Sequence, residues 1–139
     1  PRKPSFVEST LLKAMRGEPL AAIADKYSLP TDAHDIARAI LALLPTQACG
    51  VYHVCASGAP VSWHDCARYA LEHAVQCGAL AAMPHLAPQR LKDATFLKEI
   101  RPPHTAMSNA KLVAAGVPMP TAQETVRGVV KRLLRQICA

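Results

Sequence analysis

Apolar residues recur every three or four positions along much of the chain, and this spacing predicts amphipathic α-helices. The first helix is expected to begin at a Ser-x-x-Glu capping box formed by Ser5 and Glu8 and to end at Gly17. The second is expected to have Thr31 as its N-cap and to end at Pro45. It carries a broad apolar stripe that predicts a buried face, made of Ala33, Ile36, Ala37, Ile40, Leu41 and Leu44.

Three further helices follow in the second half of the chain. One is expected from the cap Ser62 to about Gly78, and a short one over residues 108–115. A second capping box, Thr121 with Glu124, predicts the start of the last helix. Its apolar face is expected to consist of Val126, Val129, Val130, Leu133, Leu134 and Ile137.

Short apolar runs predict two strands, over residues 20–24 and 50–56. Residues 79–103 form the least regular stretch and contain four prolines, which is typical of a binding loop. Two strands do not make a stable sheet alone, so the 50–56 strand is expected to need neighbours. The pattern as a whole predicts a helix-rich α/β fold with few short strands.

Composition narrows the class of protein. A chain of 139 residues with 50% hydrophobic residues can bury the core of one domain. The longest apolar run, residues 39–44, is far shorter than the roughly 20 residues of a membrane span, and the start has no signal-peptide pattern, so we expect a cytoplasmic protein without a membrane partner. The net charge of +6 favours anionic partners such as nucleotides. The densest cationic group, Lys131, Arg132 and Arg135, is interpreted as a solvated helix face.

The cysteines indicate free thiols. There are five, an odd number, and no pair has Cys-x-x-Cys spacing, so neither a disulfide framework nor a zinc site is expected. Four residues at helical spacing predict a buried core stripe instead: Cys66, Ala70, His73 and Cys77. The six glycines are also widely separated, whereas a dinucleotide-binding turn needs them close together. No cofactor-binding residue and no metal ligand is therefore assigned to this chain.

Several short motifs occur in an order that resembles the C-terminal half of dTDP-4-dehydrorhamnose reductase, an extended short-chain dehydrogenase of the nucleotide-sugar reductase and epimerase superfamily. The resemblance extends from about Ser5 to Leu134 and rests on order rather than on one specific motif. The matching segments are Ser5-Phe6, Asp25 to Thr31, Asp35-Ile36-Ala37, Gly50 to Val54, Ser62-Trp63 with Ala67, Arg101-Pro102 with Thr105 and Met107, and Asn109 with Lys111, Leu112 and Gly116.

The resemblance implies the substrate-binding portion of an extended Rossmann-fold enzyme, with residues 1–139 forming a single partial domain. The family's Tyr-x-x-x-Lys pair is absent, because Thr31, Ala56 and His73 stand four residues after the three tyrosines. No catalytic residue is therefore assigned. The implied ligand is a nucleotide-sugar whose diphosphate Arg101 would bind, with Lys26 and His104 as weaker candidates. The implied partners are an N-terminal half that binds NAD(P)H and a second copy of the chain, which would pair through an exposed edge or apolar face.

Two other functions remain open at this stage. The chain could be a non-catalytic regulatory subunit of the same family. Residues 20–40 also fit the apolar spacing of a DNA-binding helix-turn-helix, although Asp32 and Asp35 would repel phosphates. A helix at residues 20–24 would favour DNA binding, and a strand there would favour the reductase.

Overall fold

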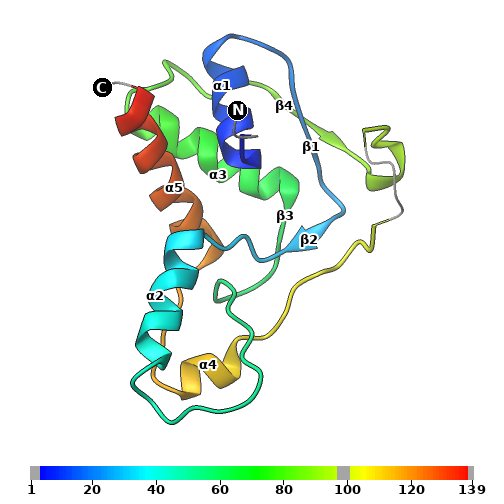
Figure 1. Ribbon diagram of the computed structural model, residues 1–139. Helices are drawn as coiled ribbons and strands as arrows, with labels where there is room; N and C mark the ends of the chain where they lie inside the picture. Colours follow the sequence, from blue (N-terminus) through cyan, green and yellow to red (C-terminus); the bar gives the residue numbers. More distant parts are fainter. Residues whose placement is uncertain (1–3, 97–100, 138–139) are drawn as a thin grey trace.

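A computed structural model describes residues 4–96 and 101–137 of the chain. Helices alternate with a few short strands, as the sequence predicts (Figure 1). The elements are α1 (Phe6–Met15), β1 (Leu20–Ile23), β2 (Tyr27–Ser28), α2 (Ala33–Leu43), β3 (Val61–Ser62), α3 (Trp63–Gln76), β4 (Leu86–Gln89), the 3₁₀ turn η1 (Leu91–Asp93), α4 (Ala110–Ala114) and α5 (Ala122–Ile137).

Helices α1, α3 and α5 pack together with β1 and β4, and we call these five elements the helical body. Each of the three helices contributes apolar residues to one core. Ile137, which was predicted on the buried face of the last helix, is 44% exposed. The buried residues of that core are Val7, Leu11, Cys66, Ala70, Ala74, Val126, Val130, Leu133 and Leu134. A second cluster joins the helices to β1 through Ala14, Leu20 and Leu71.

The predicted capping boxes are present and fix where the helices of the body begin. The Ser5 hydroxyl accepts a hydrogen bond from the Glu8 N–H at 3.2 Å, and the Glu8 carboxylate accepts one from the Ser5 N–H at 3.3 Å. Ser62 and Asp65 make the same reciprocal pair at the start of α3. These bonds satisfy N–H groups that a helix N-terminus otherwise leaves unpaired.

The structure contains strands that the sequence pattern does not predict, in two places. β4 lies inside the stretch expected to be irregular and pairs in parallel with β1, with Leu20 opposite Leu86. Pro88 hid this strand from the pattern, yet proline is tolerated at a sheet edge because no N–H is needed there. β2 and β3 form a second, antiparallel pair of only two residues each, too short for any period to show.

Because β1 occupies residues 20–23, the segment that would supply the first helix of a helix-turn-helix is a strand. The DNA-binding interpretation therefore does not fit this fold.

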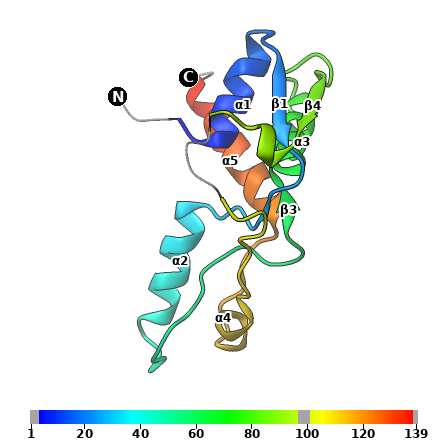
Figure 2. The same cartoon turned by 90° about the vertical axis from the view of Figure 1, so that its right-hand side faces the viewer.

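The remaining elements form what we call the extension: α2, residues 44–57 and α4, which project away from the helical body (Figures 1 and 2). The predicted N-cap of α2 is wrong by one residue. Asp32 is the cap, and its carboxylate accepts from the His34 N–H at 3.2 Å. Thr31 instead donates to the Leu29 carbonyl and accepts from the Ala56 N–H, both at 3.0 Å, which ties the start of α2 to the returning chain.

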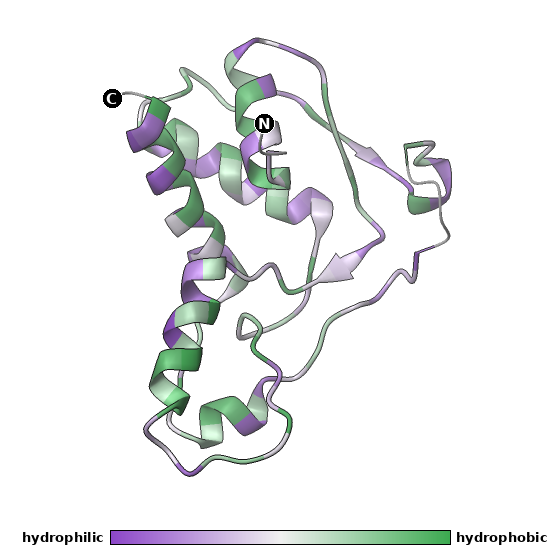
Figure 3. Ribbon diagram, viewed as in Figure 1, coloured by the Kyte–Doolittle hydropathy of each residue, from purple (hydrophilic) through white to green (hydrophobic). Residues whose placement is uncertain are grey.

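The predicted burial of the α2 stripe is also wrong. Ile40, Leu41 and Leu44 are 49%, 67% and 70% exposed, and on α2 only Asp35 and Ala39 are buried. The physical reason is visible in Figure 2, where α2 stands apart from the body with no layer over its outer side. Hydrophobic residues continue along the exposed part of this helix in Figure 3. The predicted amphipathic helix is present, but the described chain contains nothing that covers its apolar stripe.

The predicted strand at residues 50–56 does not form a strand either. Its backbone groups are bound by side chains instead of by a neighbouring strand. Lys111 Nζ donates to the Val51 carbonyl at 3.1 Å, and Asn109 Nδ2 donates to the Cys55 carbonyl at 3.0 Å. A small cluster of Ala39, Leu112, Val117 and Met119 lies beneath this segment. Without a ladder partner in the described part of the chain, the apolar run has nothing to pair with.

Candidate functional site

Lys26 is buried, with 4% of its surface exposed, at the turn between β1 and β2. Its Nζ donates a hydrogen bond to the Pro102 carbonyl at 2.8 Å and lies 5.6 Å from the centroid of the Trp63 ring. A buried ammonium needs such partners because it has left water. Lys26 therefore anchors the 101–105 segment to the start of α3, and its charge points inward rather than toward solvent.

The 101–105 segment runs beside Tyr27. The Tyr27 N–H donates to the Pro103 carbonyl at 2.7 Å, and the Thr105 N–H donates to the Tyr27 carbonyl at 3.0 Å. The ring of His104 stacks on the ring of Tyr27, with centroids 6.0 Å apart and planes 27° apart. The structure thus brings together two segments, residues 26–27 and 101–105, that lie more than seventy residues apart in the sequence.

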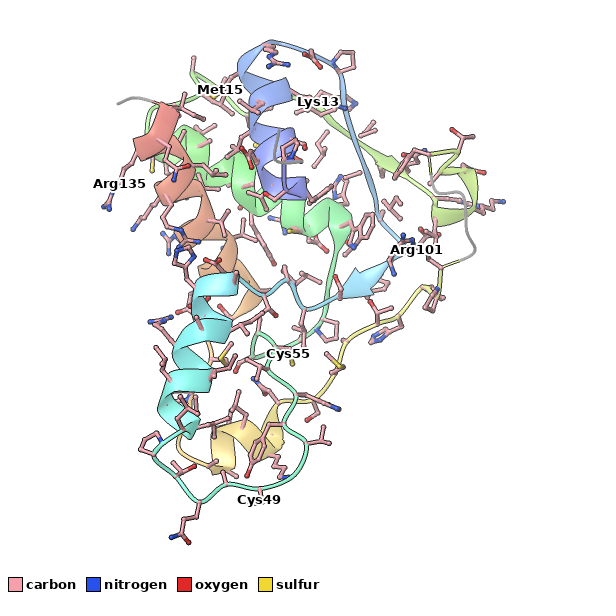
Figure 4. All side chains as sticks on the ribbon, in the orientation of Figure 1. Lys13, Met15, Cys49, Cys55, Arg101 and Arg135 are labelled. Carbon is pink, nitrogen blue, oxygen red and sulfur yellow. The ribbon has the colours of Figure 1, made fainter. Side chains whose placement is uncertain are left out.

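Arg101 is exposed and, among the described residues, its guanidinium makes no hydrogen bond or ion pair. Figure 4 shows it next to the turn that carries Lys26, on the opposite side of the molecule from Arg135. Arg101 and His104 are both exposed and lie on one short segment held rigid from beneath by Lys26. A planar guanidinium in this position can bind a diphosphate through two parallel hydrogen bonds.

A groove of about 610 Å³ opens between the N-terminal ends of α1, α2 and α3 and one face of α5. Phe6 and Trp63 form an aromatic pair in its wall, with ring centroids 5.7 Å apart and planes tilted by 41°. Val126, Val129 and Leu133 supply an apolar floor from α5. Such a mixture of aromatic wall, apolar floor and few polar groups is typical of a small-molecule site.

None of the three predicted site residues lines this groove, but Trp63 connects it to them. Along one edge of the molecule, Trp63 in the groove wall contacts the buried Lys26, and Lys26 in turn holds the segment that carries the exposed Arg101. The groove was not predicted from the sequence, although several of the matching segments contain residues that line it. Six residues of the matching segments line it: Ser5, Phe6, Ser28, Pro30, Thr31 and Trp63.

An ion pair between Asp32 and Arg132 closes one side of the groove and joins α2 to α5. Burial alone would raise the pKa of Asp32, but hydrogen bonds from Arg132 and from the backbone and ring of His34 outweigh it and hold the pKa below its ordinary value of 3.8. The hydroxyl of Thr125 is buried beside this pair and has no hydrogen-bond partner among the described residues.

Over residues 4–96 and 101–137, no group of three or more His, Cys, Asp or Glu side chains is placed to hold a metal ion. The glycines are dispersed through the fold, so the described residues offer no glycine-rich turn for a dinucleotide. In the same residues, no helix is both long and apolar enough to cross a membrane.

The sequence model of the RmlD substrate binding domain matches residues 2–135, nearly the whole chain. The chain belongs to this family. The motifs that line the groove are therefore part of an RmlD substrate binding domain, and the helix-rich α/β fold is that of the family. Among curated proteins, no sequence matches the chain.

Solved structures of similar fold include dTDP-4-dehydrorhamnose reductase from Bacillus anthracis in complex with NADP, with a TM-score of 0.77, 21% identity, and coverage of 98% of this chain and 44% of that one. The Clostridium acetobutylicum dTDP-4-dehydrorhamnose reductase aligns with a TM-score of 0.78, 17% identity, and coverage of 95% and 45%. UDP-glucose 4-epimerase from Thermus thermophilus, in complex with NAD, gives a TM-score of 0.55, 24% identity, and coverage of 92% and 39%. The RmlD-type chain thus spans less than half the length of these proteins.

Proposed function

We propose that this RmlD-type chain is the nucleotide-sugar-binding part of an NAD(P)H-dependent reductase that acts on a dTDP-4-keto sugar. In this proposal, residues 1–139 form one partial domain, which works in the cytoplasm and is inactive by itself. A separate half binds the reduced nicotinamide, which supplies the hydride and lies next to the catalytic tyrosine. This chain contributes recognition and orientation of the sugar nucleotide.

The observation that carries the proposal is the match to a substrate binding domain over residues 2–135, together with the position of the matching motifs. Residues from three separated motifs, at positions 5–6, 30–31 and 63, line one groove. Because these motif residues meet at a solvent-accessible groove, they are available to a ligand, which supports a binding role besides their roles in the fold.

The chemistry of this edge suits a nucleotide diphosphate joined to a sugar. The exposed guanidinium of Arg101 supplies a bidentate contact for the diphosphate, and His104 supplies a second donor on the same segment. Lys26 acts from beneath, because its bond to the Pro102 carbonyl fixes the segment that presents both. The aromatic pair of Phe6 and Trp63 provides an apolar wall for a ring of the ligand.

The exposed side of the extension is the proposed contact with the cofactor-binding half. Leu41, Leu44 and Val51 are 67%, 70% and 76% exposed, and they belong to a helix and a segment whose patterns predicted burial. The solved relatives of this fold are more than twice as long as this chain and include complexes with NADP and NAD. A nucleotide-binding layer laid over α2 would bury these residues and give the 50–54 segment a strand to pair with.

Titration of dTDP into the chain tests the ligand, with binding followed by NMR chemical shifts. We expect the shifts to cluster at residues 26–27, at residues 101–105 and around Trp63. Arg101→Ala should weaken binding about tenfold, because a charge-assisted hydrogen-bond pair contributes roughly 1.5–3 kcal/mol. Arg135→Ala is the matched control: it removes an exposed arginine from the far side of the molecule and should leave binding unchanged.

The proposal fails if dTDP shifts no resonance in the groove or on the 101–105 segment, or if both arginine variants weaken binding equally. A second measurement concerns activity. Mixed with NADPH and a dTDP-4-keto sugar, the chain alone should oxidise no NADPH. Turnover by this chain would contradict the assignment of the chemistry to another half.

A further inference from the structure

Three side chains at the C-terminal end of α3 form a connected group outside the proposed substrate site. Cys77 Sγ lies 3.5 Å from Nε2 of His73, and Nδ1 of the same ring lies 3.3 Å from Oε1 of Gln76. The sequence pattern predicted that Cys77 would be buried with His73 in a core stripe. The structure buries His73 but leaves Cys77 exposed, so a thiol accessible to solvent rests against a buried imidazole.

The hydrogen bonds of the His73 ring determine which of its two nitrogens carries the hydrogen. The carbonyl oxygen of the Gln76 side chain can only accept, so Nδ1 of His73 carries the hydrogen in this geometry. Nε2 is then the unprotonated nitrogen and accepts the hydrogen of the Cys77 thiol. A nucleophile, a base within hydrogen-bond reach and a third group that orients the base form the arrangement that activates thiols in proteins.

The other described cysteines lack this arrangement. Cys66 is buried, and burial raises the pKa of its thiol to about 12. Cys55 is buried and donates to the Met107 carbonyl, and burial also raises its pKa. Cys49 is exposed like Cys77, but its sulfur has no hydrogen-bond partner within residues 4–96 and 101–137. Cys49 is therefore a matched comparison for Cys77 in the same molecule.

We propose that Cys77 is a thiol-modification site that exchanges with low-molecular-weight disulfides, with His73 as the base and Gln76 as the residue that positions it. His73 Nε2 takes the thiol proton while Sγ attacks one sulfur of the disulfide. The new bond joins Cys77 Sγ to that sulfur, the original S–S bond breaks, and the departing thiolate receives the proton from the imidazolium. Cys77 is oxidised to a mixed disulfide, and half of the small disulfide is reduced to a thiol.

The end of the helix shapes this chemistry. The C-terminal end of a helix carries the negative end of its dipole, so α3 gives no electrostatic support to a thiolate at Cys77. The group therefore acts by removing the proton during attack rather than by storing a negative charge on sulfur. This distinguishes it from reactive cysteines at helix N-termini, where the dipole itself stabilises the thiolate.

Oxidised glutathione tests the proposal on the full chain, with the modified peptides quantified by mass spectrometry over time. The mixed disulfide should form at Cys77 about tenfold faster than at Cys49, which is less than the roughly 100-fold or more that a general base provides in an evolved active site. His73→Gln should bring Cys77 to the rate of Cys49. Gln76→Leu, at an exposed position, should slow Cys77 about threefold without altering the core, since only the orientation of the ring is lost.

The rate at Cys66 reports folding in every variant, because a buried thiol becomes reactive only when the core opens. If Cys66 becomes reactive in His73→Gln, the core of that variant has opened. The rate at Cys77 in Gln76→Leu then tests the proposal instead. Equal rates at Cys77 and Cys49 in the unaltered chain would overturn the proposal, and so would an unchanged Cys77 rate in a folded Gln76→Leu variant. Because His73, Gln76 and Cys77 do not line the groove, the result at Cys77 is independent of dTDP binding.

Discussion

The helical body and the extension are built from similarly amphipathic sequence but reach very different degrees of burial. In the body, α1, α3 and α5 each bury their apolar face, and Leu71 and Val130 are fully inaccessible. In the extension, α2 has an equally clear apolar stripe, yet most of its large residues face solvent. The difference lies in what surrounds each helix and not in the helices themselves.

This contrast teaches that a periodic pattern reports what a helix is suited to bury, whether or not the partner belongs to the same polypeptide. The body is a complete core, because its helices cover each other. The extension leaves much of its apolar surface exposed, and hydrogen bonds of Thr31, Asn109 and Lys111 hold it in place together with one small apolar cluster. We therefore expect mutations in the helical body to change mainly stability, and mutations on the exposed side of the extension to change mainly binding.

The largest effect should come from the body. Leu71→Ala removes a side chain with 0% exposure between α3 and β1 and leaves a cavity. We expect it to lower the free energy of unfolding by about 3 kcal/mol, as measured by chemical denaturation. A loss below about 1 kcal/mol would mean that the body is not the rigid core described above.

A smaller effect should come from the polar ties of the extension. Asn109→Ala removes the donor that binds the Cys55 carbonyl at 3.0 Å and the Ser57 hydroxyl at 2.9 Å. We expect a loss of about 1.5 kcal/mol. Amide hydrogen exchange should show faster exchange in residues 54–57 and unchanged protection in α3. Uniformly faster exchange over both regions would contradict their independence.

The ion pair that joins the two regions should add a pH-dependent contribution. The pKa of Asp32 is lower in the folded chain than its ordinary value, so the stability that it contributes is present above about pH 4 and is lost as the pH falls through the lowered pKa. Asp32→Asn should reduce the free energy of unfolding by about 1 kcal/mol at pH 7, because the pair is partly exposed. The difference between variant and unaltered chain should shrink toward pH 3, and a constant difference would rule out this linkage.

The smallest effect on stability should come from the outer side of α2. The double variant Leu41→Lys and Leu44→Lys should change the free energy of unfolding by less than about 0.5 kcal/mol, because both side chains are already solvated. It should, however, reduce self-association in sedimentation experiments at high protein concentration. A large loss of stability would show that α2 is covered within the single chain after all.

Local signals in the sequence were enough to place the helices. The contacts that start and end a helix join residues only a few positions apart, as in the capping boxes at Ser5 and Thr121 and the stop at Gly17. The sequence alone therefore explains where these helices begin and end. β4 could not be found in this way, because its pairing with β1 depends on a segment more than sixty residues distant and includes Pro88.

The candidate site was only partly readable for the same reason. The role predicted for Arg101, Lys26 and His104 in binding a diphosphate stays a prediction. Their meeting on neighbouring segments, and the burial of Lys26 beneath Pro102, depend on the tertiary fold. The groove is lined from four helices, and no spacing along the chain reports such a meeting. The side-chain ties on residues 50–56 could not be predicted either, since a strand-like run carries no sign of whether its ladder partner is present.

Those ties have a kinetic consequence for assembly. Lys111 binds the carbonyls of Cys49 and Val51, and its ammonium lies 4.2 Å from the centroid of the Tyr52 ring. A strand that pairs with the carbonyls of this segment has to displace the Lys111 ammonium first. Pairing therefore replaces one set of hydrogen bonds by another. We therefore expect residues 49–51 to open locally before a strand pairs with them, and Lys111→Met to increase the rate of that pairing.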